Sequence, residues 1–339
     1  MKTYMRLWIL VLSFAALSLA ADAPGFKLTR KYPVPGDGGF DYIVFDGSAN
    51  RLYVSHGTQV DVLDAASGSV LGTVENTPGV HGIAIVPSLH RGFATNGKNA
   101  TVSVFDTDTF KTLKIITVPD DPDFVFYDSR DQRVMVCHGD ASAITAIDPA
   151  KEEVIGKIAL GGGAEAAVLD GKGTGFVNLE KEAMMVTFDP LALTVKQKWP
   201  ITWREKPTGL AMDASNSRLF IGCRSRVLAV MDANSGKVIT TLPIGERVDA
   251  VAFDTDNQLI FASNGGGTIS VIRQKGPNEY ESVGDIQTQI SAKTMALDPR
   301  TKQLFLSAAE METTPAAEGQ RPHMRPKPGT FAVLVVERQ

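Results

Sequence analysis

Short apolar runs separated by polar turns recur along this chain. Residues 206–245 show the pattern most clearly, because two clusters of Asp, Asn, Ser and Gly, at 213–217 and 232–236, interrupt the apolar runs. Such residues tolerate tight backbone angles and bond their own backbone, so each cluster is expected to reverse the chain. The stretch therefore predicts four short antiparallel strands, at 209–212, 218–222, 227–231 and 238–244.

The same unit repeats along the chain at intervals of 40, 42, 42, 43, 41 and 44 residues. The interval is measured at the end of the first strand of each unit, at Asp46, Val86, Asp128, Asp170, Asp213, Asp254 and Asp298. The third strand ends in a second series, Asp64, Asp106, Asp148, Asp189 and Asp232, with Arg273 in sixth place. Two series with one period predict seven copies of one four-stranded unit.

A period near 40 residues with four strands per unit is typical of β-propeller blades, which cover their apolar faces against one another. We therefore predict an all-β fold, a seven-bladed β-propeller with four antiparallel strands per blade, as a single domain over 21–339. The last unit has three strands before the chain ends, and 26–34 matches the missing fourth. We expect this N-terminal strand to complete the last blade and close the ring, which removes an exposed sheet edge.

Regularly repeated positions are expected to be architectural. An arginine opens the second strand of four units, and we predict that it ties neighbouring turns together. Small residues on the innermost strands are predicted to pack at a crowded axis rather than to line a channel. The arginines are Arg51, Arg91, Arg133 and Arg218, and the small residues are Ala166, Gly209, Ala211, Ala250, Ala252 and Ala296.

The first twenty residues predict a signal peptide. Lys2 and Arg6 precede an apolar run at 7–19, and Ser18-Leu19-Ala20 fits a cleavage site. The run is short for a membrane span, and cleavage would leave Ala21 rather than a cysteine at the new terminus. The interpretation is a periplasmic or secreted protein with no transmembrane span after signal cleavage.

Charge and motifs narrow the function classes. Removing Lys2 and Arg6 changes the formal net charge from −4 to −6, which argues against a nucleic-acid partner. A local basic patch around Arg204, Lys206, Arg247 and Lys293 keeps single-stranded nucleic acid as a third alternative. The sequence has no G-x-S-x-G, H-E-x-x-H or phosphate-binding loop, so no cofactor is predicted. We expect a monomer.

The second-strand segments RLYVS, RGFATN and RLFIG, together with the Asp turn after the third strand, resemble the YVTN-repeat β-propellers, which include the YncE-like exported proteins. The resemblance covers nearly all of the predicted mature chain and implies a seven-bladed propeller. That family contains binding proteins and proteins of no assigned role, so the resemblance implies no particular activity. Blade four lacks the repeat arginine, and blade six lacks the third-strand aspartate.

Function is expected on the face formed by the loops before the first strand and after the second strand, which we call the top face. His56, His81 and His138 fall there in three consecutive blades. The candidate ligand-binding residues are Asp41, His56, His81, Asp123, His138, Glu165, Asp249 and Lys293.

These residue types leave several functions open. Imidazole and carboxylate together suit a divalent metal or a small polar ligand, whereas loop residues of these types also cap turns without any ligand. The favoured hypothesis is a non-catalytic binding platform for a protein, an envelope polymer or a small polar ligand. The alternative is an enzyme of the lyase or lactone-hydrolase type, with a top-face histidine as base.

Residues 309–329 are the one segment that the repeat does not require. They join the second and third strands of blade seven, so they belong to the top face. Four prolines are expected to disfavour helix and sheet here, and the second half is basic. A loop of this length is expected to be a lid, a partner-binding segment or an inert insertion.

Overall fold

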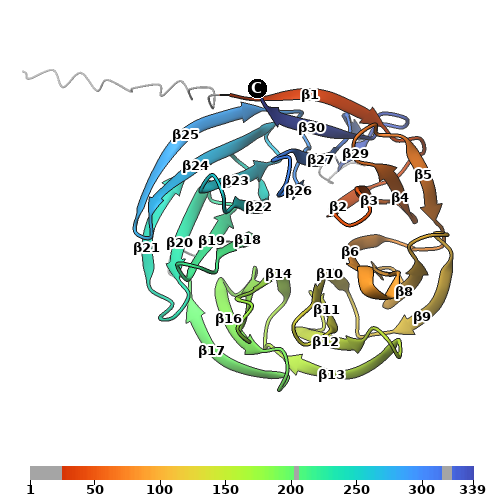
Figure 1. The fold of residues 1–339 in the computed structure, drawn as a ribbon, viewed down its shortest axis with the longest axis horizontal. Coiled ribbons are helices and arrows are strands. Elements are labelled where there is room, and N and C mark those ends of the chain that lie inside the picture. The colour runs from red at the N-terminus through yellow and green to blue at the C-terminus, as the bar shows by residue number, and fades with distance from the viewer. Residues whose placement is uncertain (1–24, 202–205, 315–322) are drawn as a thin grey trace, which may run out of the picture.

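The structure is a computed structural model that describes residues 25–201, 206–314 and 323–339. Seven four-stranded antiparallel sheets stand around a central axis as the blades of a propeller (Figure 1). The predicted all-β, seven-bladed fold is confirmed. The expected signal peptide at 1–20 lies outside the described residues.

Blades one to six each use four consecutive strands, ordered from the axis outward. Blades one and two contain β2 (Phe40–Asp46), β3 (Arg51–His56), β4 (Gln59–Asp64), β5 (Val70–Val74), β6 (Val80–Val86), β7 (Arg91–Asn96), β8 (Thr101–Asp106) and β9 (Thr112–Thr117). Blades three and four contain β10 (Pro122–Asp128), β11 (Arg133–His138), β12 (Ala143–Asp148), β13 (Glu153–Ala159), β14 (Ala164–Leu169), β15 (Gly175–Leu179), β16 (Met184–Asp189) and β17 (Thr194–Pro200). Blades five and six contain β18 (Pro207–Asp213), β19 (Arg218–Cys223), β20 (Val227–Asp232), β21 (Val238–Pro243), β22 (Val248–Asp254), β23 (Leu259–Asn264), β24 (Thr268–Gly276) and β25 (Glu279–Gln287). A short 3-10 helix, η1 (Pro87–Leu89), lies between β6 and β7.

Blade seven joins the two ends of the chain. Its strands are, from the axis outward, β26 (Met295–Leu297), β27 (Leu304–Ala308), β30 (Ala332–Arg338) and β1 (Phe26–Pro33). The outermost pair is antiparallel and runs from Phe26 opposite Arg338 to Pro33 opposite Ala332. The predicted closure of the ring by the N-terminal strand is therefore confirmed.

The hydrophobic core lies between neighbouring blades. Met135 and Cys137 of blade three, for example, belong to one buried cluster with Val177 and Leu179 of blade four. The second and third strands of a blade are buried almost throughout, whereas the outer strands expose most positions. Fully burying one such apolar side chain contributes roughly 1.5–3 kcal/mol to stability, so each blade is stabilised by its neighbours.

The innermost strands surround a channel of about 590 Å³, lined in part by Ala166, Gly209 and Ala250. The axis is therefore not crowded as expected, but the predicted packing role holds for Ala166, Ala211 and Ala296, which pack against the blade cores. Gly209 is needed between strands: a Cβ there would lie 2.7 Å from the backbone nitrogen of Val251 in the next blade. Small residues let neighbouring inner strands approach, and the axis itself stays open. In the described part of the chain, no helix is long and apolar enough to cross a membrane.

Candidate functional site

In blades one to six, a β-bulge aims one side chain of the inner strand at the top of the channel. In blade one, Phe40 pairs with His56 and the next paired residue is Ile43, so Asp41 falls within the irregularity. Blades two to six have the same shift at the same place. A bulge leaves a residue outside the ladder and re-aims its side chain. We call the charged residues around this opening the mouth ring: Asp41, His81, Asp123, Glu165, Asp249 and Lys293.

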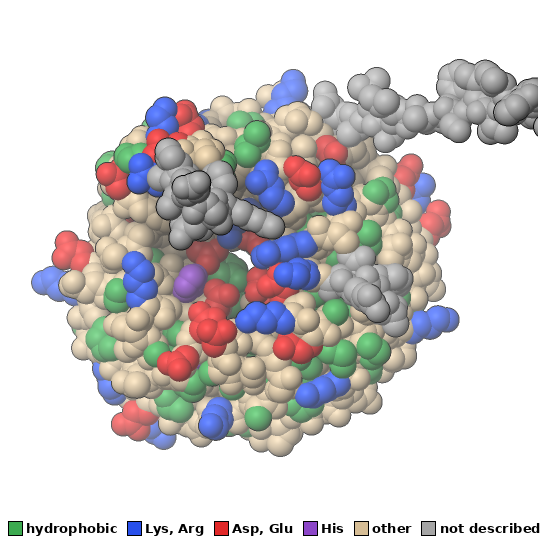
Figure 2. Space-filling model, turned by 180° about the vertical axis from the view of Figure 1, so that it is seen from behind, with side chains coloured by type: hydrophobic (Ala, Val, Ile, Leu, Met, Phe, Trp, Pro, Cys, Tyr) green, Lys and Arg blue, Asp and Glu red, His purple; other side chains and the backbone are tan. Residues whose placement is uncertain are grey.

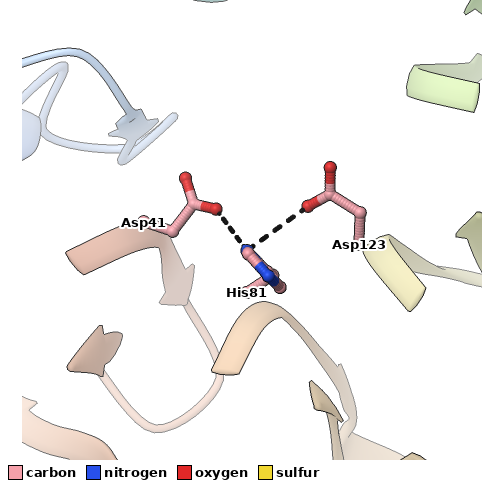
Figure 3. A group of neighbouring side chains, drawn as sticks. All are labelled: Asp41, His81 and Asp123. Carbon is pink, nitrogen blue, oxygen red and sulfur yellow. Dashed lines mark hydrogen bonds and ion pairs between the residues drawn. The ribbon is translucent and has the colours of Figure 1, made fainter. Parts of the chain in front are cut away.

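Three members of the mouth ring, one from each of blades one to three, point toward one another (Figure 3). His81 Nδ1 lies 2.8 Å from Asp41 Oδ2 and 3.8 Å from Asp123 Oδ1. The side chains of Asp41, His81 and Asp123 are 20%, 36% and 23% exposed, so water screens their charges only partly.

Neighbouring blades hold the backbone of these residues. Thr294 of blade seven donates a hydrogen bond to the carbonyl of Asp41, and the Asp41 N–H donates to Ser55 Oγ at 3.0 Å. Thr95 of blade two donates to the carbonyl of Asp123 at 2.6 Å. These bonds hold the backbone of Asp41 and Asp123, so their side chains are preorganised.

Two cations pair with the other side of the mouth. Lys293 Nζ lies 2.8 Å from Asp249 Oδ2 and 3.4 Å from Asp41 Oδ1. Arg224 reaches Glu180 at 3.3 Å and Asp249 at 3.9 Å. The sequence-based candidate set omits Glu180 and Arg224; the position of Glu180, at the end of the second strand, was the available signal. Figure 2 shows acidic and basic side chains gathered around the channel opening on this face.

Internal pairing shifts the pKa values of three groups in the direction that favours their charged forms. Burial opposes ionisation of Asp41, but the hydrogen bond with His81 and the charge of Lys293 outweigh it and lower the pKa of Asp41. The same hydrogen bond raises the pKa of His81. Burial also disfavours the charged form of Lys293, and the charges of Asp41 and Asp249 raise its pKa nonetheless.

For two other carboxyl groups, nearby cations lower the pKa too little to outweigh burial and neighbouring negative charge. Burial and the charge of Asp41 raise the pKa of Asp123 to about 7. Burial and the charge of Asp123 raise the pKa of Glu165 to about 8. Glu165 makes no ion pair or hydrogen bond within the described residues, and Asp123 Oδ1 is buried without a hydrogen-bond partner there. We call these two residues, in blades three and four, the acidic sector.

The structure does not bring the three predicted histidines together. His56 is buried, with Nδ1 2.9 Å from Asp61 of its own blade and its ring 4.4 Å from that of Phe331. His138 is also buried; its Nε2 lies 2.9 Å from Thr145 Oγ1, and burial lowers its pKa. Both residues end a second strand, and both are buried there. Of these three candidates, only His81 belongs to the mouth ring.

The group of Asp41, His81 and Asp123 has the composition of a metal site. Its ligand atoms all lie within 4.8 Å of one another. A divalent ion would have to displace the hydrogen bond between His81 Nδ1 and Asp41, and it would lie close to the Lys293 ammonium, 3.4 Å from the same carboxylate. Repulsion between the two cations weighs against a resident metal at this place.

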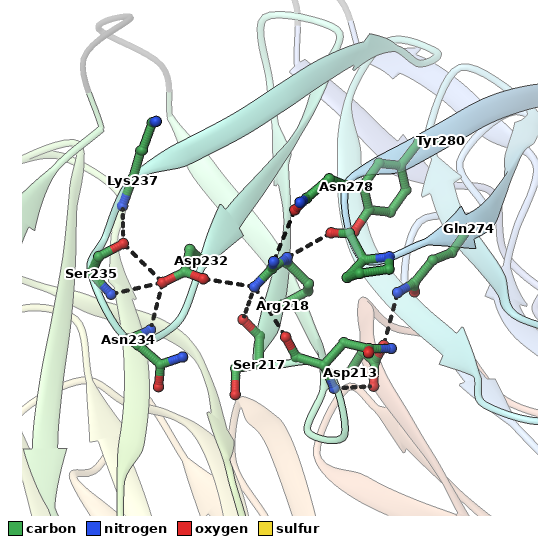
Figure 4. Close-up of polar contacts among 12 residues, drawn as sticks. Asp213, Ser217, Arg218, Asp232, Asn234, Ser235, Lys237, Gln274, Asn278 and Tyr280 are labelled. Carbon is green, nitrogen blue, oxygen red and sulfur yellow. Dashed lines mark hydrogen bonds and ion pairs between the residues drawn. The ribbon is translucent and has the colours of Figure 1, made fainter.

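The repeat arginines lie on the opposite face and tie neighbouring blades, as predicted. In blade five, Arg218 donates to Asp232 at 2.7 Å and to the carbonyl of Pro277 and the side chain of Asn278 in blade six, at 2.6 and 2.9 Å (Figure 4). Arg51 and Arg133 likewise bond carbonyls of the next blade. Their function is structural.

The insert of blade seven forms a β-hairpin at its base. β28 (Met311–Thr314) pairs antiparallel with β29 (His323–Pro326) as a separate two-stranded sheet. The expectation that the prolines exclude sheet is wrong for these segments. Pro326 ends an edge strand, where a missing N–H is tolerated. Residues 315–322 lie outside the described part of the chain.

Comparisons with known proteins show the fold. No family model matches the chain. The pre-rRNA-processing protein IPI3 of Meyerozyma guilliermondii is 27% identical over 167 residues, which cover 48% of this chain and 35% of that protein. The chain thus matches about a third of the length of that curated relative. Among solved structures, the hydrazine synthase of Kuenenia stuttgartiensis has a TM-score of 0.69 at 15% identity, covering 87% of this chain and 95% of that one. A chain of the mitotic checkpoint complex has a TM-score of 0.73 at 14% identity, covering 97% and 100%.

Proposed function

We propose that this protein is an exported, non-catalytic binding platform that takes a small polar ligand carrying an ammonium group at the mouth of its channel. The observation that carries the proposal is the acidic sector. Asp123 and Glu165 are carboxyl groups brought together by neighbouring blades, with His81 as the nearest cationic partner at 3.8 Å from Asp123. A bound cation would supply the charge that the sector lacks and would favour ionisation of both groups.

The wall below the acidic sector suits the same ligand. Tyr42 and Phe124 follow Asp41 and Asp123 directly, line the channel, and lie with their rings 5.4 Å apart. Aromatic faces attract ammonium groups through their quadrupole. A carboxylate above and an aromatic wall below is thus a suitable setting for an alkylammonium group.

Binding is proposed rather than catalysis because one histidine, not three, belongs to the mouth ring. His81 is already hydrogen bonded to Asp41, which is in turn paired with Lys293. This arrangement holds charges in fixed positions, as a recognition site requires. We propose in addition that the chain is a YVTN-repeat propeller and that it is exported to the periplasm or medium. Sequencing the N-terminus of the native protein tests export, and Ala21 is the expected first residue.

The test of the binding proposal is a titration of the full mature chain with butylammonium and with butyrate, followed by NMR. We expect butylammonium to shift signals of mouth residues and to bind better at pH 8.5 than at pH 6, because Asp123 and Glu165 ionise across that interval. The double variant Asp123→Asn, Glu165→Gln should weaken binding about tenfold or more. Glu153→Gln, on an exposed outer strand, is the matched control. Equal binding of butyrate, or an unaffected double variant, would reject the proposal.

A further inference from the structure

The hairpin of blade seven roofs a second pocket on the top face. The pocket has a volume of about 410 Å³ and lies between the hairpin and the rim formed by blades five, six, seven and one. Its lining has an apolar part and a basic part, with the single carboxylate Asp249 paired to Arg224 and Lys293 of the basic part, and it does not include Asp123 or Glu165. The pocket therefore calls for a ligand of different chemistry from the one proposed for the acidic sector.

The apolar part exposes large side chains. Met311, Met324 and Pro326 come from the hairpin, and Phe40 and Ile290 lie on the rim. Met324 is 57% exposed and Ile290 is 59% exposed. Covering such side chains would contribute about 25 cal/mol per Å² of apolar surface removed from water. Thioether side chains adapt to the shape of an apolar ligand.

The basic part contains Arg224, Arg247 and Lys293. Arg224 and Lys293 already pair with Asp249, whereas the exposed Arg247 side chain makes no ion pair or hydrogen bond within the described residues. The backbone of Arg247 has φ of 61°, and its carbonyl accepts a hydrogen bond from the Gly265 N–H at 2.9 Å. An arginine is thus fixed at the rim with its guanidinium available to a ligand.

Hydrogen bonds from the rim hold the base of the roof. The Gly329 N–H donates to Asp37 Oδ1 at 2.9 Å, and Ser291 Oγ donates to the carbonyl of Ala309 at 2.6 Å. Lys327 pairs with Glu310 at 3.0 Å and so joins the two segments at the base of the hairpin. Both ends of the insert are therefore attached to the propeller, and the pocket is preformed.

We propose that this pocket binds a small amphiphilic organic anion, with its acidic head on Arg247 and its apolar body along Met311, Met324 and Ile290. The volume lies within the usual range for small-molecule sites, and such sites combine apolar walls with few polar anchors. Arg forms strong charge-assisted bonds with both carboxylates and phosphates, so either head group fits. The inference stands on residues other than those of the acidic sector and goes beyond the function proposed above.

The experiment compares four eight-carbon probes on the full mature chain by isothermal titration calorimetry: octanoate, octyl phosphate, 1-octanol and octylammonium. We expect at least one of the two anions to bind about tenfold or more tightly than the alcohol of equal length. The ratio of octanoate to octyl phosphate binding distinguishes a carboxylate ligand from a phosphate ligand. Octanol binding as tightly as both anions would overturn the proposal.

Variants separate this pocket from the acidic sector. Arg247→Gln should weaken anion binding about tenfold, and Met324→Gln, in a strand outside the blades, should weaken it through the apolar wall. Arg273→Gln, an exposed arginine on β24, is the matched control and should change nothing. The double variant Asp123→Asn, Glu165→Gln should keep anion binding while it loses butylammonium. Unchanged anion binding in both Arg247→Gln and Met324→Gln would reject the site, whatever the outcome for the amine.

Discussion

The two faces of this propeller use charge in opposite ways. On the face of the repeat arginines, each arginine bonds the next blade: Arg51, Arg133 and Arg218 reach backbone carbonyls 56, 57 and 59 positions further along the chain, and Arg91 reaches the Glu152 carboxylate 61 positions further. On the top face, equivalent positions carry Asp, His, Glu, Thr and Lys, and the pairs run between different blades. Contacts that repeat from blade to blade stabilise the whole ring, whereas equivalent positions that carry different residues indicate a binding site.

The largest effect is expected on the arginine face. Arg218→Ala removes bonds to Asp232, Pro277 and Asn278 and leaves Asp232 without its cation, so it should lower the free energy of unfolding by about 2–4 kcal/mol. Urea unfolding measures the change. Arg273→Ala, at an exposed position in blade six, should cost less than about 0.5 kcal/mol. Equal losses in the two variants would contradict the structural function of the repeat arginines.

On the top face, substitution is expected to stabilise the protein at high pH. Burial raises the pKa of Asp123 from 3.8 to about 7 and that of Glu165 from 4.5 to about 8. The folded state thus binds these protons more tightly than the unfolded state, and the associated stability is lost as the pH rises through these values. The double variant Asp123→Asn, Glu165→Gln should therefore gain on the order of 2 kcal/mol relative to the wild type at pH 8.5 and little at pH 5.

Thermal unfolding at the two pH values measures this difference, with Glu153→Gln as the control. A double variant that is less stable than the wild type at pH 8.5 would show that the acidic sector stabilises the ring, and the contrast between the two faces would fail.

A smaller effect is expected on the pKa of a single imidazole, that of His81. Asp41→Asn weakens the hydrogen bond that raises the pKa of His81, so that pKa should fall. NMR titration of the imidazole signals measures it. Asp108→Asn, beside the exposed His90, should leave the titration of His81 unchanged. An unchanged pKa of His81 in Asp41→Asn would mean that the hydrogen bond between His81 and Asp41 does not form in solution.

The smallest effect is expected from divalent ions. Adding Zn²⁺ or Mn²⁺ to EDTA-treated protein, up to roughly 0.1 mM, should leave the melting temperature unchanged, because Lys293 lies beside Asp41 and opposes a second cation. A rise in melting temperature that Asp123→Asn abolishes would instead establish a metal site.

The fold was predictable because its signal is local and repeated. The turn aspartates act within a few residues: Asp213 Oδ1, for instance, accepts a bond from the Ser215 N–H. Six of the seven repeats carry such a turn aspartate and define the period. The last repeat has only three strands, which indicates where 26–34 must pair. The arginine contacts followed from the same regularity.

The sequence predicted which face carries the site, but only some of the residues that form it. A fixed offset of five residues before the end of each first strand located Asp41, His81 and Asp123, because these three blades bend at the same bulge. The sequence does not show which way a side chain at the end of a strand points, so His56 and His138 were misplaced. The pairing of 311–314 with 323–326 was missed because it depends on a partner strand and not on composition.

The closure of blade seven bears on how this protein is made. Thr29 bonds the carbonyl of Val335, 306 residues further along the chain, and Arg30 pairs with Glu337. During synthesis β1 emerges early, yet it has no sheet to join until β30 has been made. The nascent chain must carry an unpaired strand while six complete blades accumulate, and such distant pairing is slow. The pairing of β1 with β30 is thus a late step in folding. A truncation that removes β30 also leaves β1 without a strand to pair with.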